Sequence, residues 1–150
     1  MPKTKTLVSA FAAILLMAGT ASADELAKYD VVDMAIPTSL TGKAGDAAAG
    51  EKVFINRKLG NCLACHQVTA LKAQPFHGLI GPTLDGVAER YNEGQLRLQV
   101  VNAKAINPDT IMPAFYRTEG LHRVLDKFEG KGILTAGQVE DVVAYLKTLK

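Results

Sequence analysis

The chain has 150 residues, of which 48% are hydrophobic and 21% are charged, with 17 basic and 15 acidic side chains. This size suits a single domain with one hydrophobic core. The formal net charge is only +2, so the chain lacks the strong positive charge that is typical of nucleic-acid-binding proteins. The same small charge gives no indication of binding to an anionic membrane surface.

Residues 1–23 have the layout of a secretory signal peptide. Lys3 and Lys5 form a short positive region, residues 7–17 are apolar and uncharged, and the segment closes with Ala-Ser-Ala. We expect cleavage after Ala23 and export to the periplasm. The alternative is an uncleaved membrane anchor, for which the apolar run is short. Removing the signal takes away two lysines and leaves the chain without formal net charge.

Residues 24–44 are expected to form an N-terminal extension without a helix. Their apolar side chains follow no helical period, and Pro37 interrupts the segment. Side chains such as Val31, Val32 and Ile36 are unusual on a free surface. We therefore predict that some of them are buried, either against the domain or against a partner protein.

The domain itself is expected to span residues 45–150 and to begin with a helix over 45–60. Asp46 can cap this helix, and the alanines that follow favour it. Gly50 lies inside it, where glycine costs about 1 kcal/mol relative to alanine. Such a glycine indicates that another helix approaches closely. The buried side of the helix is expected to include Ala49, Val53 and Phe54.

A second helix is predicted over residues 90–105. Asn92 and Gln95 have the spacing of a capping box at its start. Asn107 and Pro108 prevent its continuation. Its inward-facing side chains are expected to be Leu96, Val100 and Val101.

The last helix has the clearest pattern. Thr135 and Gln138 form a second capping box. Acidic residues such as Glu140 lie near its start and lysines near its end, as the helix dipole favours. One apolar stripe at helical spacing contains Val139, Val142, Val143, Leu146 and Leu149.

Loops containing glycine and proline separate these helices, at 75–86, 106–117 and 129–133. No two segments alternate strongly enough to pair as strands. We therefore predict an all-α, loop-rich domain. Loops this long in so short a chain need something to pack against.

Both cysteines lie in the pattern Cys62-x-x-Cys65-His66, which is typical of c-type haem attachment. On a helical turn, residues i and i+3 share a face and residue i+4 lies beside them. Two sulfurs so placed can form thioethers with the two vinyl groups of one haem, and the histidine can bind the iron. The alternatives are a disulfide, a zinc site with about four ligands, and a thioredoxin-like redox pair after a strand.

Met112 is our candidate for the second axial ligand of the iron. It lies in a proline-bounded loop, and Pro113 favours an extended backbone at Met112. A thioether is a soft ligand, and a His/Met pair raises the reduction potential of haem. The alternatives are a core role for Met112, or ligation by Met34 or His77. We expect His122 on the surface.

The second ring nitrogen of His66 needs a hydrogen-bond partner. The segment Ile-Gly-Pro-Thr-Leu at 80–84 offers the carbonyl of Pro82, since proline retains a free acceptor. We predict that this carbonyl accepts the hydrogen bond from Nδ1 of His66. An ordinary Gly-Pro turn is the alternative, and it is compatible with this role.

Together these residues resemble the class I cytochrome c family, an all-α fold around one covalently bound haem. The matching parts are the first helix, the Cys-x-x-Cys-His pattern, the Gly-Pro-Thr-Leu turn, the methionine loop and the last helix. In that family the first and last helices cross at a close contact. The resemblance therefore implies that Gly50, Phe54 and Tyr145 pack together.

Four segments resemble a narrower group, the SoxX subunits of the bacterial Sox sulfur-oxidation system. They are Ala35–Asp46, Gly60–His66, Ile106–Arg117 and Gly130–Leu146, and the resemblance extends over residues 30–150. It implies one haem c and a heterodimer with a SoxA-like c-type cytochrome.

The complex would act as an L-cysteine S-thiosulfotransferase, which joins thiosulfate oxidatively to a cysteine of the carrier SoxYZ. This chain would accept the electrons and pass them to a small cytochrome c, with no catalytic residue of its own. Two alternatives stay open. One is a free diffusible cytochrome c, and the other is an exported thiol–disulfide oxidoreductase.

Overall fold

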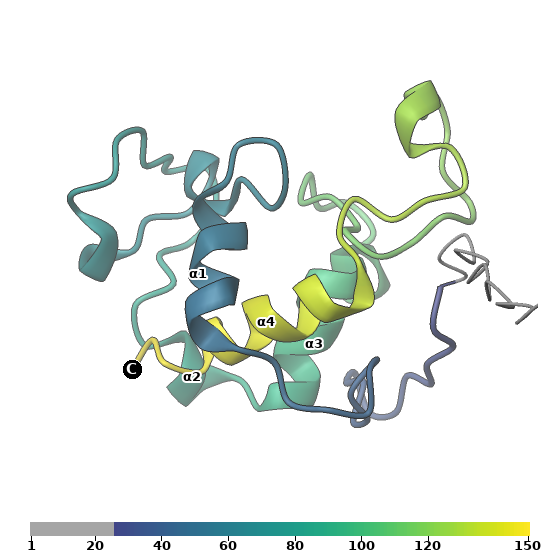
Figure 1. The fold of residues 1–150 in the computed structure, drawn as a ribbon, viewed down its shortest axis with the longest axis horizontal. Coiled ribbons are helices and arrows are strands. Elements are labelled where there is room, and N and C mark those ends of the chain that lie inside the picture. Colours follow the sequence, from purple (N-terminus) through teal and green to yellow (C-terminus); the bar gives the residue numbers. More distant parts are fainter. Residues whose placement is uncertain (1–25) are drawn as a thin grey trace, which may run out of the picture.

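The structure is a computed structural model that describes residues 26–150, so the predicted signal peptide lies outside the described residues. Four α-helices form the scaffold (Figure 1): α1 (Ala47–Ile55), α2 (Val87–Arg90), α3 (Glu93–Asn102) and α4 (Ala136–Leu146). Short 3₁₀ turns lie at Cys62–Ala64, Thr69–Leu71, Ala103–Ala105 and Asp126–Phe128. This part of the chain contains no strand beyond one isolated bridge, which confirms the predicted all-α class.

The first helix begins as predicted but ends earlier. The Asp46 carboxylate accepts a hydrogen bond of 2.7 Å from the amide of Ala49, which caps α1. The helix stops at Ile55 rather than continuing to residue 60. The Gly60 amide donates back to the carbonyl of Val53, which folds the intervening residues into a turn.

Both predicted capping boxes are present, at Asn92 and Gln95 before α3 and at Thr135 and Gln138 before α4. The two helices bury the side chains that their periodicity selects. The exposed fraction is 7% or less for Leu96, Val100 and Val101 on α3 and for Val139, Val142, Val143 and Leu146 on α4. Leu149, which the predicted stripe also included, is equally buried but lies after the end of α4.

Helix α4 crosses α1 and packs against α3 (Figure 1). At the crossing, a Cβ on Gly50 would lie 1.9 Å from the backbone oxygen of Asp141, so only glycine fits. The rings of Phe54 and Tyr145 pack beside it, with centroids 5.3 Å apart and planes tilted by 60°. The close contact that the family resemblance implied is therefore confirmed.

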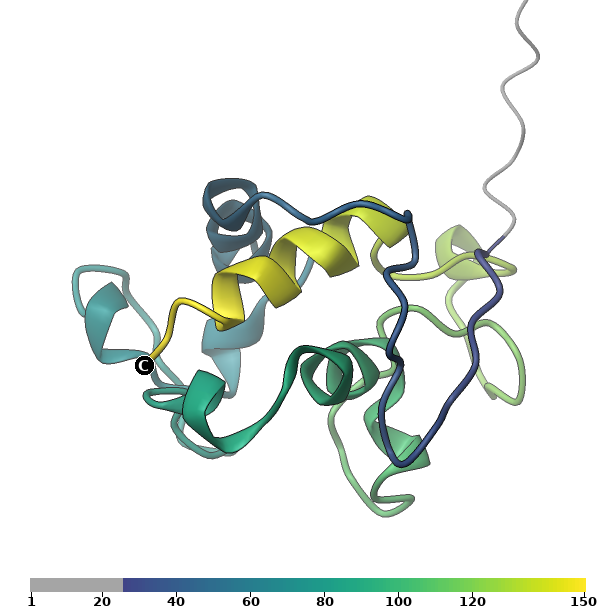
Figure 2. The same ribbon diagram turned by 90° about the horizontal axis from the view of Figure 1, so that it is seen from below.

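The described part of the extension runs along the domain without forming a helix. Figure 2 shows it looping beside α3 and then passing along α4 to reach α1. Ile36 is buried, with 1% of its surface exposed, whereas Val31 and Val32 are about half exposed. The prediction of burial is thus confirmed for Ile36. The hydroxyl of Tyr116 also accepts a hydrogen bond of 2.7 Å from the amide of Ala27.

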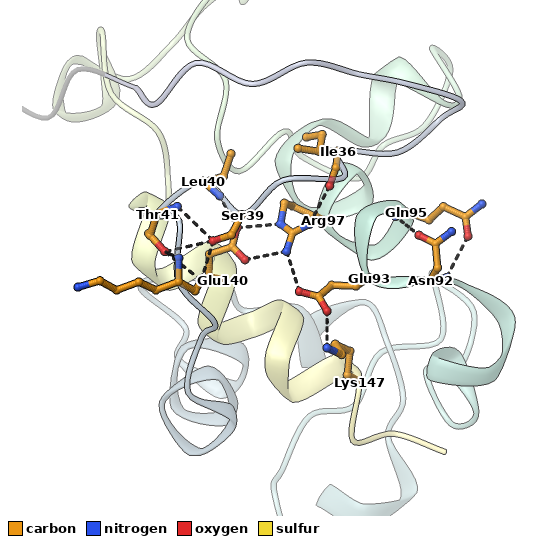
Figure 3. A network of polar contacts seen from close by, with 11 residues as sticks. Ile36, Ser39, Leu40, Thr41, Asn92, Glu93, Gln95, Arg97, Glu140 and Lys147 are labelled. Carbon is orange, nitrogen blue, oxygen red and sulfur yellow. Dashed lines mark hydrogen bonds and ion pairs between the residues drawn. The ribbon is translucent and has the colours of Figure 1, made fainter.

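A buried ion pair between Arg97 of α3 and Glu140 of α4 also binds the extension (Figure 3). Nε and Nη2 of Arg97 donate to the two carboxylate oxygens of Glu140, at 2.8 and 2.9 Å, and Nη1 donates to the Ile36 carbonyl at 2.7 Å. Glu140 also accepts from the amide of Leu40. Burial would lower the pKa of Arg97, but the hydrogen bonds and charge of Glu140 raise it. Glu140 therefore does more than complement the helix dipole.

Candidate cofactor site

A large cavity of about 1060 Å³ opens between the helices and the loops. Its wall is predominantly apolar and includes side chains of α1, α3 and α4, such as Phe54, Leu96, Val100, Val142 and Leu146. The volume lies at the upper end of the range for small-molecule sites. The long loops thus surround a space of the size that a bulky apolar group requires.

Cys62, Cys65, His66 and Met112 all line this cavity. The first three belong to one tight turn. The 3₁₀ turn begins at Cys62, and Cys65 and His66 follow it directly, with their amides both donating to the carbonyl of Cys62, at 3.1 and 2.9 Å. The sequence pattern was interpreted as part of a helix, and the structure contains only this tight turn. The turn still brings both sulfurs and the imidazole to the same wall.

The predicted hydrogen bond between His66 and Pro82 is present. Nδ1 of His66 lies 2.7 Å from the carbonyl oxygen of Pro82. A carbonyl can only accept, so Nδ1 carries a proton, and in the neutral imidazole Nε2 then has a free lone pair. Gly81 lies against the ring, because a Cβ there would come within 2.4 Å of the imidazole.

The loop that carries Met112 is fixed to α3 on its C-terminal side. The amides of Phe115 and Tyr116 donate to the carbonyls of Val100 and Val101, at 3.2 Å each. The Met112 amide itself donates to the hydroxyl of Thr110. The Met112 side chain is therefore part of a tethered loop, although it lies 46 positions after His66 along the chain.

The other candidate ligands lie elsewhere. Met34 is in the extension and is 48% exposed. Nε2 of His77 is engaged by the carbonyl of Leu71 at 3.0 Å, and His77 is not part of the cavity wall. His122 is exposed, as predicted.

The thiols do not fit the competing kinds of site. Neither cysteine is in a disulfide, and no group of three His, Cys, Asp or Glu residues within 26–150 could hold a metal ion. Burial raises the pKa of Cys62 to about 12, with a smaller contribution from Cys65. A redox-active thiol needs a lowered pKa instead. The described residues also lack the strands of the βαβ unit in which a thioredoxin-like pair occurs.

The positive charge of the cavity wall was not predicted from the sequence. Every charged side chain that lines the cavity within the described residues is a cation: Arg57, Lys58, Arg90 and Lys127. Arg57 also lies over the ring of Phe76, 4.6 Å from its centroid. No sequence motif connects these residues, because they come from three separate parts of the chain, at 57–58, 90 and 127. An apolar interior with cations at its wall fits haem, which is flat, apolar and carries two carboxylates.

Comparison with known proteins agrees with this geometry. Residues 47–150 match the family described as "Cytochrome c". The chain is also similar to a solved structure, the crystal structure of SoxXA from P. pantotrophus. The two chains share 46% sequence identity and superpose with a TM-score of 0.76, over 81% of this chain and 94% of the other.

A comparison with curated proteins gives no match. In the part of the chain that the structure describes, no helix has the length and hydrophobicity of a membrane span.

Proposed function

The chain belongs to the cytochrome c family, and we propose that it is the electron-accepting haem subunit of a SoxXA-type complex. The observation that carries the proposal is the convergence of four groups on one apolar cavity. Both thiols, one imidazole and one thioether line it, and it is large enough for a bulky cofactor. The cofactor of the family is haem c, which supplies one-electron acceptance and donation when bound.

In this proposal Cys62 and Cys65 would attach the haem through thioether bonds, and His66 and Met112 would bind its iron. Pro82 supports the assignment of His66, because its carbonyl fixes the imidazole tautomer and leaves Nε2 free for the metal. Both thiols are then consumed, so neither is available to carry a sulfur intermediate. With His66 and Met112 both bound to the iron, this chain would bind no substrate there.

The bond-making chemistry therefore belongs to a partner. We propose a periplasmic heterodimer with a SoxA-like c-type cytochrome, which the similarity to the SoxXA structure supports. As an L-cysteine S-thiosulfotransferase, the pair would form a sulfur–sulfur bond between thiosulfate and a cysteine of SoxYZ. This step breaks the S–H bond of the cysteine and releases one proton to solvent and two electrons. This chain would accept the electrons one at a time and pass them to a small soluble cytochrome c.

The test is affinity purification of the tagged chain from periplasm, followed by a haem-stained gel and a spectrum. We expect a covalent c-type spectrum, a second haem-stained band, and reduction of the complex by thiosulfate when SoxYZ is present. A coloured monomer that thiosulfate never reduces, even with the other Sox proteins added, would instead indicate a free diffusible cytochrome c. A colourless protein with two titratable thiols would contradict both cytochrome functions.

A further inference from the structure

The turn that carries the Pro82 carbonyl is fixed from its far side by a polar cluster. The Asp85 carboxylate accepts two hydrogen bonds from Thr69, from its amide at 2.9 Å and from its hydroxyl at 2.6 Å. Thr69 lies three residues after His66. Asp85 therefore links the segment that contains the imidazole to the turn that contains its acceptor.

Arg90 holds the backbone of the same turn. Nη1 donates to the Asp85 carbonyl at 2.7 Å, and Nη2 donates to the Thr83 carbonyl at 3.0 Å. The amide of Leu84 donates to the carbonyl of Gln67 at 3.0 Å. The backbone groups of Thr83, Leu84 and Asp85 thus all have hydrogen-bond partners. The carbonyl of Pro82, which precedes them, therefore has little freedom to move.

The charge state of this cluster is also defined. The hydroxyl and the amide of Thr69 hold the pKa of Asp85 below its usual range, and Thr83 and Arg90 act in the same direction. Asp85 is therefore a carboxylate at neutral pH and accepts both hydrogen bonds. Neither Asp85 nor Thr69 lines the cavity, so any effect on a cofactor passes through Pro82 and His66.

We propose that Asp85 and Thr69 are positioning residues that set the basicity of His66. They hold the Pro82 carbonyl 2.7 Å from Nδ1, and a hydrogen bond at this nitrogen makes the imidazole a more basic ligand. A more basic imidazole stabilises the oxidised iron and lowers the reduction potential. This inference rests on the proposed binding of haem iron by His66.

The experiment compares Thr69→Val with Thr69→Ser in the haem-loaded protein. The valine variant loses the hydroxyl and keeps the Asp85 charge, whereas the serine variant keeps the hydroxyl. We expect the reduction potential to rise in Thr69→Val and to stay at the wild-type value in Thr69→Ser. We also expect the Nδ1 proton of His66, observed by NMR, to exchange up to about tenfold faster in Thr69→Val alone.

Wild-type potential and proton exchange in Thr69→Val would overturn the inference, and so would equal changes in both variants. If Thr69→Val does not accumulate with haem, Asp85→Asn takes its place, because it keeps an acceptor for the Thr69 amide. Its deciding measurement is the proton exchange, since losing a negative charge shifts the potential by itself; an unchanged rate overturns the inference. A wild-type protein without a haem spectrum would contradict the proposed function instead.

Discussion

At the scale of single residues, His66 is constrained from two sides by groups that do no redox chemistry. The Pro82 carbonyl fixes the proton on Nδ1, and Gly81 lets the turn lie directly against the ring. Both constraints come from one short turn, which a polar cluster at Asp85 holds in place. Protein groups thus set the orientation of the imidazole.

Met112→Ala tests the opposite axial position. We expect the oxidised protein to lose the methionine–iron charge-transfer band and the reduction potential to fall, because a soft thioether favours the reduced iron. Absorption spectroscopy and redox titration measure both effects. Met34→Ala is the matched control, since Met34 is half exposed and does not line the cavity. An unchanged band in Met112→Ala would remove Met112 as the ligand.

At the scale of helices, the crossing of α1 and α4 sets the back of the cavity. Both helices contribute to its wall, through Phe54 on α1 and through Val142 and Leu146 on α4. The absence of a side chain at Gly50 determines how closely the two backbones approach. A larger side chain at position 50 would push α1 and α4 apart and would therefore alter the shape of the cavity.

Gly50→Ala is expected to destabilise the protein by about 1–3 kcal/mol, because the new methyl group would overlap the backbone of α4. This cost exceeds the gain of about 1 kcal/mol in helix propensity. Gly137→Ala is the matched control. Gly137 is an exposed helical position with only ordinary contacts, so alanine there should stabilise the protein slightly. Urea unfolding of both variants measures the difference; equal effects would contradict the close contact.

The ion pair between α3 and α4 gives a second prediction at this scale. Glu140→Ala removes two hydrogen bonds from the buried Arg97 guanidinium and leaves the half-exposed Glu93 as its counter-charge, which costs about 3 kcal/mol of unfolding free energy. Lys147→Ala is the control, because Lys147 pairs with Glu93 on the surface of the same network and contributes about 0–1 kcal/mol. If Glu140→Ala unfolds in urea no more easily than Lys147→Ala, the buried pair does not hold the helices together.

At the scale of the whole molecule, the extension is part of the packed structure. It buries Ile36, donates from the Leu40 amide to Glu140, and meets the hydroxyl of Tyr116 through Ala27. These contacts reach α3, α4 and the C-terminal side of the Met112 loop. The extension thus connects the parts of the chain that surround the cavity.

Deleting residues 26–40 is expected to lower the urea unfolding midpoint, because it exposes apolar surface and removes two partners of the buried ion pair. These are the Ile36 carbonyl, which accepts from Arg97, and the Leu40 amide, which donates to Glu140. The double variant Val31→Ser, Val32→Ser serves as the control. Both side chains are about half exposed, so their replacement should leave stability unchanged and affect only the capture of a partner. A deletion variant with wild-type stability and partner capture would show that the extension is dispensable.

The sequence by itself determined the features that depend on local chemistry. Capping boxes, the apolar stripe of α4 and the haem-attachment pattern involve residues a few positions apart, whose spacing fixes their geometry. The Pro82 contact to His66 was also predictable, because the histidine needs an acceptor and the nearby Gly-Pro turn offers one.

Only the tertiary structure decided which distant groups meet. Arg97 and Glu140 are 43 positions apart, and Ala27 and Tyr116 are 89 positions apart. On their helices, Arg97 and Glu140 look like surface charges, because charged residues are normally solvated and periodicity carries no information about partners. The cationic cavity wall and the cluster around Asp85 also arise from packing of separate segments. Their roles follow from burial and distance, which a one-dimensional pattern does not contain.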